Sequence, residues 1–379
     1  MNLLVLGPYG DTTSGPSRVL TEVVNNLSTN IDMLVLSPKK RRQHTRTDTD
    51  IGKIKIRYQP CGSIPRIAGS HQWIEFARIN RRLTKLDYKP DLVWIHDAAL
   101  FAAYRFSKFN RVPSISTIHG VFGSYYKSET SQQSGRFMVD VITKQNVFLQ
   151  RFQFTNSTVL TTYSGYLKGL IKDVSPSSKV EVIPNGVNVT RFPISKNPRK
   201  KVIIYVGRMA KIKGVHVLID SFKEVMKRNP DWSLWLVGGA FDQPKSFFER
   251  YISAETEKNI KFLGQIPNEE LSEILNDAGI FVMPTIRDGF EIALMEAMAT
   301  GIPCVTTAAY ERSELYGGYA ATVPPNDSKA LGKELNYIID NYTDFTADSE
   351  MMKRVNRAHE FDWKMIAHRY ENLFKELTK

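Results

Sequence analysis

The chain has 379 residues, roughly two to three times the usual domain length, and its 42% apolar and 24% charged residues are typical of a globular protein. No apolar run approaches the ~18 residues that span a bilayer, which argues against an integral membrane protein. The two cysteines, Cys61 and Cys304, lie far apart and lack metal-ligand spacing, which argues against a disulfide framework and structural zinc. The net charge of +12 is uneven, since residues 1–200 carry 29 Lys and Arg against 13 Asp and Glu (net +16), whereas residues 201–379 carry 22 against 26 (net −4).

Short apolar runs alternate with amphipathic stretches of helix length through the first half of the chain. The opening MNLLVLGPYG lacks a basic segment before its apolar residues, so we expect a buried strand there and not a secretion signal. The pattern predicts strands near 2–7, 31–37, 53–58, 91–96, 114–118, 157–162 and 180–183, and helices near 16–28, 72–86, 137–154 and 164–172.

The second half repeats this alternation more regularly. It predicts strands near 202–207, 233–237, 280–284 and 303–307, and helices near 214–229, 268–278 and 290–300. Strands that alternate with helices indicate parallel sheets joined by right-handed crossovers. We therefore expect two α/β domains that face each other across a cleft, joined by a polar, proline-containing linker at 193–200.

The turn from Gly207 to Gly214 joins a predicted strand to a predicted helix and carries two cations, Arg208 and Lys213. Open α/β sheets bind ligands at the carboxyl ends of their strands, and a helix N-terminus adds free amide donors. The turn therefore predicts a diphosphate site. A solvated basic turn is the alternative, which the two cations alone would favour.

The residues from Asp288 to Glu296 follow another predicted strand. Asp288 falls in the turn above the strand end, and Glu296 falls about two turns into the helix. Ionised carboxylates accept several hydrogen bonds and therefore suit sugar hydroxyls. An acidic first turn that complements the helix dipole would explain Glu291, but it explains Glu296 poorly because the neighbours of Glu296 are apolar.

Two strand ends in the first half carry candidate residues. Gly15 precedes Pro16 at a predicted helix start and allows close approach of a ligand, although a plain tight turn explains this loop equally well. The loop is no GxGxxG fingerprint and predicts no nicotinamide cofactor. His119 follows strand 114–118 and is placed to donate to a substrate or to stabilise charge. A buried, hydrogen-bonded histidine is an equal alternative, and His96, at another strand end, has the same two interpretations.

The Asp48-Thr49-Asp50 segment has the form of a metal-binding Asp-x-Asp motif. It follows a polar stretch and no apolar strand, so we expect a loop tip there. Since no other cluster offers hard-cation ligands at a suitable spacing, we expect no metal site.

Taken in order, these residues resemble the family 4 retaining glycosyltransferases of the GT-B fold, and the resemblance covers most of the chain. That fold has two Rossmann-like doubly wound domains facing a cleft and a C-terminal helix that crosses back to the first domain. The landmarks are Gly15, His119, Ser164, Asn185-Gly186-Val187 with Phe192, the Gly207–Gly214 turn, and the carboxylate pair before Ala297, Gly301 and Pro303. The last two landmarks are the most specific.

The resemblance implies a division of labour between the domains. Residues 1–195, with the C-terminal helix 361–379, would form the acceptor-binding domain, and residues 199–360 would form the nucleotide-sugar donor-binding domain. Arg208, Lys213 and Gly15 would bind the donor diphosphate, and Asp288 and His119 would be the catalytic residues. The residues at the donor sugar, phosphate and ribose would be Glu296, Gly289, Phe290, Glu291 and Ile292.

Such enzymes retain the anomeric configuration and have no obvious protein nucleophile, so the site must stabilise a departing diphosphate and an oxocarbenium-like sugar. Arg208 and Lys213 meet the first demand, so neither a metal nor another cofactor is expected. The chain departs from the family pattern at three positions. Asp288 stands where Glu is usual, and Glu reaches ~1.5 Å further. Glu291 stands where Gly is frequent, and Asn188 stands where Asp is frequent. The departure at Asp288 bears on sugar choice and on activity.

We therefore expect a retaining, metal-independent hexosyltransferase that uses a nucleotide sugar and a saccharide or lipid-linked acceptor in cell-surface polysaccharide, glycolipid or glycoprotein assembly. It would be cytoplasmic, and its basic first domain would contact an anionic membrane surface, with a merely solvated basic surface as the alternative. Nucleic acid is not expected as a partner, because the aromatic residues do not interleave with the basic runs. A non-catalytic nucleotide-sugar-binding scaffold, suggested by Asp288, and a nucleotide-sugar epimerase remain as alternatives.

Overall fold

The structure, a computed structural model, describes residues 1–7, 15–37, 49–51, 54–60, 87–96, 111–121, 136–239, 242–267, 269–287, 289–308 and 312–379. The predicted helix at 72–86, Cys61 and Asp288 lie outside these residues. The chain forms two compact units: unit 1 comprises Met1–Asn185 and Trp363–Lys379, and unit 2 comprises Gly186–Asp362. The sequence places the corresponding boundary at 195–199.

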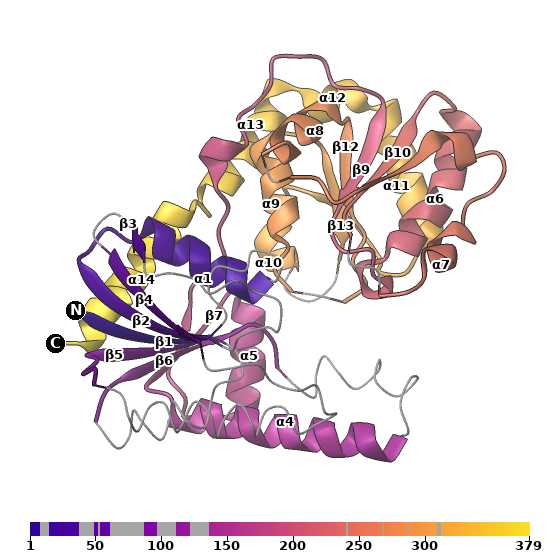
Figure 1. Cartoon of the computed structure of the whole chain (residues 1–379). Coiled ribbons are helices and arrows are strands. Elements are labelled where there is room, and N and C mark those ends of the chain that lie inside the picture. Colours follow the sequence, from indigo (N-terminus) through magenta and orange to yellow (C-terminus); the bar gives the residue numbers. More distant parts are fainter. Residues whose placement is uncertain are drawn as a thin grey trace. The chain divides into compact units, whose positions relative to one another are not determined.

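Unit 1 contains an eight-stranded sheet in the order β3-β4-β2-β1-β5-β6-β7-β8, as far as the described residues show (Figure 1). All neighbouring strands are parallel except β3 and β4. The strands are β1 (Asn2–Leu6), β2 (Ile31–Ser37), β3 (Thr49–Ile51), β4 (Ile54–Pro60), β5 (Leu92–His96), β6 (Ser114–Ile118), β7 (Val159–Thr162) and β8 (Val180–Val182). Among the described residues of this unit, the helices are α1 (Gly15–Asn26), α4 (Arg136–Asn156), α5 (Gly165–Val174) and α14 (Trp363–Leu377).

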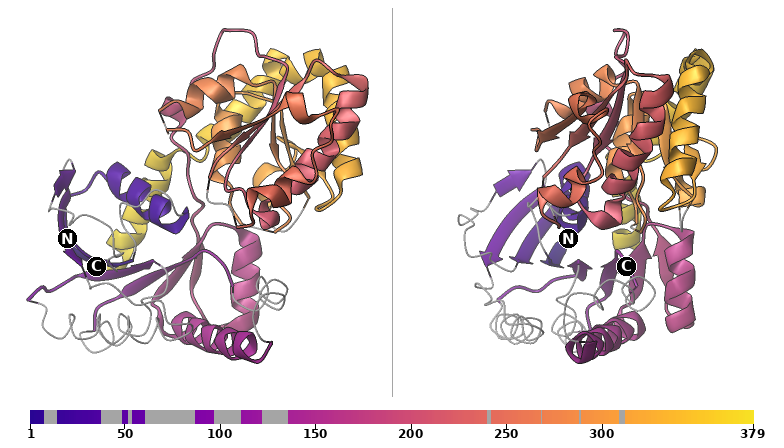
Figure 2. Two further views of the ribbon diagram at one scale, coloured as in Figure 1. Left: turned by 45° about the vertical axis from the view of Figure 1, so that its right-hand side comes forward. Right: turned by 90° about the vertical axis from the view of Figure 1, so that its right-hand side faces the viewer.

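The C-terminal helix α14 belongs to unit 1, although it follows unit 2 in sequence. It packs against α1, as the views in Figure 2 also show. The Glu371 carboxylate of α14 accepts hydrogen bonds from the Ser28 hydroxyl (3.0 Å) and the Thr29 amide (3.0 Å), just beyond the end of α1. Tyr370 and Phe374 bury their rings against Trp94 of β5. The predicted return of the terminal helix to the first domain is confirmed.

Unit 2 contains a parallel six-stranded sheet in the order β11-β10-β9-β12-β13-β14, again counting described residues. Its strands are β9 (Val202–Val206), β10 (Ser233–Val237), β11 (Ile260–Gly264), β12 (Ile280–Met283), β13 (Cys304–Thr307) and β14 (Ala321–Val323). Its α-helices are α6 (Val215–Arg228), α7 (Lys245–Glu249), α8 (Leu271–Asp277), α9 (Ile292–Ala299), α10 (Arg312–Tyr316), α11 (Ser328–Asp340), α12 (Tyr342–Thr346) and α13 (Asp348–His359). Short 3-10 helices cover Val189–Arg191, Lys211–Lys213 and Glu257–Asn259.

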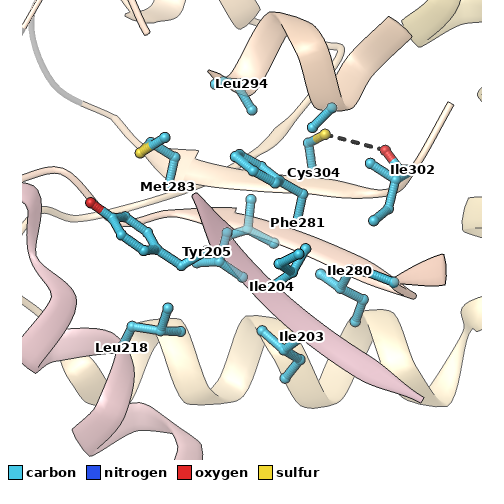
Figure 3. Close-up of a cluster of buried hydrophobic side chains, with 14 of the residues drawn as sticks. Ile203, Ile204, Tyr205, Leu218, Ile280, Phe281, Met283, Leu294, Ile302 and Cys304 are labelled. Carbon is cyan, nitrogen blue, oxygen red and sulfur yellow. Dashed lines mark hydrogen bonds between the residues drawn. The ribbon is translucent and has the colours of Figure 1, made fainter. Parts of the chain in front are cut away.

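The core of unit 2 holds its sheet and helices together. In Figure 3, Leu294 of α9 and Leu218 of α6 lie on opposite sides of strands β9 and β12. Helix α6 buries an apolar stripe, since Val215, Leu218, Ile219 and Phe222 are fully buried. Gly301 takes a positive φ of 76° directly after Thr300, the C-cap residue of α9, where a glycine commonly ends a helix. Both faces of the sheet are therefore covered by helices, as a parallel sheet requires.

Three short strands at or near the sheet edges were not predicted. β3 and β14 have three residues each, and three of the five residues of β11 are exposed, so none shows a continuous apolar run. The expected loop tip at 48–50 is wrong for Thr49 and Asp50, because both lie in β3 and pair with β4. The helices from α10 to α13 were also not predicted, although α11 has an Asp327 N-cap and buries Leu331, Leu335 and Ile338.

Candidate functional site

The strand order of unit 2 creates a switch point between β9 and β12. From β9 the chain continues to β10 on one side, and β12 pairs with β9 on the other side. Ligands of open α/β sheets bind outside the carboxyl ends of strands at such a point. The turn at 207–214 leaves β9 here and the segment at 284–292 leaves β12 here, and the amide of Ile286 donates to the Ile212 carbonyl at 2.9 Å. The fold thus brings the two most specific motifs of unit 2 together.

Hydrogen bonds to its backbone stabilise the 207–214 turn. The Gly207 amide donates to the Val237 carbonyl at 3.0 Å, and the Tyr205 hydroxyl donates to the Arg208 carbonyl at 2.7 Å. The Lys211 amide donates to both carboxylate oxygens of Asp242, at 3.0 and 3.1 Å. Because the backbone is fixed, the exposed side chain of Arg208 projects from a rigid position.

Gly214 ends the 3-10 turn and begins α6 with a φ of +70°. A Cβ atom at this position would lie 2.0 Å from the Pro284 carbonyl oxygen, so only glycine allows the two segments to approach this closely. The neighbouring Lys213 is half-buried, with its side chain 13% exposed.

We expect Gly214→Ala to be more destabilising than Gly264→Ala, because Gly264 has the same φ of +70° but a Cβ atom added there would meet no atom within 4 Å. Positive φ alone costs about 1–2 kcal/mol, and the clash with Pro284 adds to that cost at Gly214. Urea unfolding of both variants measures the difference. Equal losses of stability would contradict the steric argument.

Glu291 is a buried carboxylate at this edge of the sheet, and it lies close to two cations. Its side chain is 1% exposed, its Oε1 lies 3.6 Å from Lys213 Nζ, and its Oε2 lies 3.6 Å from Arg312 Nε. The Thr285 hydroxyl donates to Oε1, and the Glu291 amide donates to the Tyr316 hydroxyl at 3.0 Å. Glu291 is the N-cap residue of α9 and so lies just before the helix, where the sequence placed it in the first turn.

The remaining predicted residues of unit 2 surround Glu291 in sequence. Glu296 lies within α9 and is 1% exposed, and Gly289 is also buried. Phe290 is half-buried against the rings of Tyr316 and Phe361, at centroid distances of 6.4 and 5.9 Å. Ile292 is the half-buried first residue of α9. The structure therefore places Arg208, Lys213 and Gly289–Ile292 on adjoining segments of one sheet edge, and their ligand-binding roles stay predictions.

In unit 1, His119 lies directly after β6 and His96 ends the adjacent β5. Their rings are paired, with His119 Nε2 3.4 Å from His96 Nδ1. His119 is half-buried, whereas His96 is fully buried against Trp94. Gly15 is the exposed first residue of α1 in the same unit. Burial, and then the charge of His119, lower the pKa of His96 well below its usual value.

Acidification is expected to destabilise unit 1 through His96. The folded protein keeps the His96 imidazole neutral, while the unfolded chain takes up the proton near pH 6.5. The contribution of His96 to the free energy of unfolding is therefore complete above pH ~6.5. Below that pH it falls by up to about 1.4 kcal/mol per pH unit. Urea unfolding from pH 7.5 to 5.5 measures the slope. His96→Gln should flatten it, whereas His359→Gln, on an exposed residue, should not. Equal slopes in wild type and His96→Gln would contradict the assignment.

The described residues contain no group of three or more His, Cys, Asp or Glu side chains that could hold a metal ion.

Comparison with protein families gives two matches. The model of glycosyltransferase family 4 matches residues 13–191, and the model of the group 1 glycosyl transferases matches residues 187–359. The chain belongs to the group 1 glycosyltransferases.

Relatives and solved structures agree with this assignment. The transferase is 26% identical over 364 residues to mannosylfructose-phosphate synthase of Agrobacterium fabrum (86% of this chain, 78% of that protein) and 25% identical over 301 residues to glycogen synthase of Mycobacterium tuberculosis (76% and 70%). Sucrose-phosphate synthase from Thermosynechococcus elongatus superimposes with a TM-score of 0.78 at 18% identity (100% and 99% covered), and Anabaena HepE in complex with UDP-glucose superimposes with 0.72 at 16% (99% and 100%). These structures confirm the GT-B fold.

The sequence of this transferase did not predict three of the residues around Glu291: Thr285, Arg312 and Tyr316. Thr285 follows β12 and the other two follow β13, so the rule that pointed to Arg208 could also have selected Arg312. Nothing in the sequence shows that Thr285 and Arg312 face the Glu291 carboxylate while Tyr316 contacts its backbone, because these contacts depend on how β12 and β13 are paired.

Proposed function

We propose that this glycosyltransferase moves a hexosyl unit from a nucleotide sugar to a saccharide or lipid-linked acceptor, with retained anomeric configuration and without a metal. The observation that carries the proposal is the pair of cations, Arg208 and Lys213, on a rigid glycine-bounded turn at the switch point of the unit 2 sheet. Two cations beside the start of α6 suit a diphosphate, which carries charge on several oxygens. HepE, with the same fold, is a protein whose complexes contain UDP and UDP-glucose.

The chemistry of transfer requires charge stabilisation more than a nucleophile. As the bond between the sugar and the diphosphate breaks, negative charge grows on the departing phosphate and positive charge on the sugar ring. Arg208 and Lys213 would stabilise the first charge, and this is why we propose that no metal is needed. Asp288 and His119 would act on the sugar, with His119 held by the ring of His96.

The acceptor is proposed from the charge of unit 1. Unit 1 carries 29 Lys and Arg against 15 Asp and Glu, a net +14, which would attract a lipid-linked saccharide in an anionic membrane surface on the cytoplasmic side. No helix among the described residues is long and apolar enough to cross a membrane. Co-sedimentation with vesicles tests the docking: binding should be stronger to anionic than to neutral lipid, and equal binding would reject it.

Product analysis tests the transfer itself. The enzyme would be incubated with UDP-, GDP-, ADP- and dTDP-sugars and with saccharide or lipid-linked acceptors, and the release of nucleoside diphosphate and the anomeric proton signal of the product would be recorded. We expect a retained anomer and unchanged rates in EDTA. An inverted anomer would reject retention, and loss of activity in EDTA that Mg²⁺ restores would reject metal independence. Donor binding without transfer to any acceptor would favour the scaffold function.

A further inference from the structure

A buried carboxylate lies directly against a cation of the proposed diphosphate site. Glu291 contacts Lys213 with one oxygen and Arg312 with the other, both at 3.6 Å, and its side chain is 1% exposed. The proposed function gives this carboxylate no task. The contact therefore needs an explanation of its own.

The carboxylate is held from several directions. Thr285, after β12, donates to Oε1, and Arg312, at the start of α10, faces Oε2. Tyr316, one turn further along α10, accepts from the Glu291 amide at 3.0 Å. Arg312 is itself 0% exposed. Thr285 is hydrogen-bonded to the carboxylate, Arg312 faces it at 3.6 Å, and Tyr316 holds the Glu291 backbone. The anion therefore has a defined position, from which it restrains the Lys213 amino group.

We infer that Glu291 is a positioning residue that acts through Lys213 and weakens the attraction of the site for a free diphosphate. This inference rests on the proposed function. A negative charge 3.6 Å from Lys213 Nζ cancels part of the field that the cation exerts on a bound diphosphate. Because Glu291 is buried and both its carboxylate oxygens face protein groups, it acts on the ligand through Lys213 and not by contact.

Two consequences follow for the catalytic cycle. The ion pair keeps Lys213 in place before the donor arrives, so that less ordering is needed on binding. It also opposes tight retention of the nucleoside diphosphate, which must leave after each transfer. Removal of the Glu291 charge is therefore expected to strengthen diphosphate binding, whereas simple damage to the fold would weaken it.

The test compares two variants that both lack the buried arginine. Arg312→Met keeps Glu291 beside Lys213, and the double variant Glu291→Gln/Arg312→Met removes the carboxylate charge together with the buried cation that faces it. Calorimetric titration with UDP, GDP, ADP and dTDP identifies the diphosphate that wild type binds most tightly. We expect this probe to bind about 10-fold more tightly to the double variant than to Arg312→Met. Adding Lys213→Met to both should remove the difference.

Each outcome has one meaning. Equal or weaker binding in the double variant, with melting temperatures showing that both proteins are folded, would overturn the inference and leave the donor site intact. Glu291→Asp, which keeps the charge, should bind the probe within about threefold of wild type, and an affinity gain as large as that of the double variant would also overturn it. If wild type binds none of the four diphosphates, the proposed function fails and the inference fails with it.

Discussion

Replacing Arg208 or Lys213 with alanine is expected to slow sugar transfer by about 10²–10³-fold. Each substitution removes a cation aimed at the charge that develops on the departing diphosphate, and interactions of this kind typically contribute that much. The rate of nucleoside diphosphate release at saturating acceptor measures the loss. Arg208 is exposed, so its removal should leave the melting temperature of the free enzyme nearly unchanged.

Lys211 provides the matched control for this prediction. It lies in the same turn and is exposed, but its contact to Asp242 is made by the backbone amide, which alanine preserves. Lys211→Ala should therefore change the rate by less than about threefold, as expected for an exposed charge outside the site. A loss as large as that of Arg208→Ala would indicate a diffuse basic surface and would contradict a defined diphosphate site.

Glu291→Gln is expected to lower the free energy of unfolding by about 3–5 kcal/mol, because it leaves the fully buried Arg312 without its facing carboxylate. Arg312→Met in the same chain should recover most of this loss, since a buried ion pair can be replaced by apolar groups at little cost. Urea unfolding followed by tryptophan fluorescence measures both, with coincidence of two probes checking that unit 2 unfolds in one step.

An exposed ion pair serves as the comparison. Glu224 and Lys227 lie one turn apart on α6, 2.7 Å from each other, with side chains 48% and 68% exposed. Glu224→Gln should cost less than about 1 kcal/mol, because water screens such pairs. If Glu291→Gln lowers the free energy of unfolding by no more than Glu224→Gln does, the buried contact between Glu291 and Arg312 does not stabilise the packing of α10 against α9.

The strands at the centre of each sheet could be predicted from the sequence because burial on both faces requires continuous apolar runs. β5 and β9 illustrate this, since their residues are almost all buried. β11 and β14 escaped prediction for the same physical reason, since strands near a sheet edge expose part of their side chains. α11 has an apolar stripe and an Asp327 N-cap, so this helix is recognisable from the sequence.

The candidate site was predictable where chemistry depends on local sequence. Arg208, Lys213 and the segment around Phe290 follow strand ends, and parallel strands bring such ends to one edge. The Glu291 cluster was not predictable, because Arg312 and Thr285 meet Glu291 only through the pairing of β12 with β13. The sequence assigned Glu291 to helix-dipole stabilisation or to donor contacts, and a buried ion pair has no periodic signature.

The proposed transfer depends on the 207–214 turn, which we expect to bind the diphosphate of a nucleotide sugar. The most direct test is thermal unfolding of wild type and Arg208→Ala with UDP-, GDP-, ADP- and dTDP-sugars, and with NAD as control. We expect one nucleotide class to stabilise wild type by about 2–4 kcal/mol at saturation, and Arg208→Ala to lose that shift. No shift with any nucleotide sugar, or an equal shift in Arg208→Ala, would contradict this expectation.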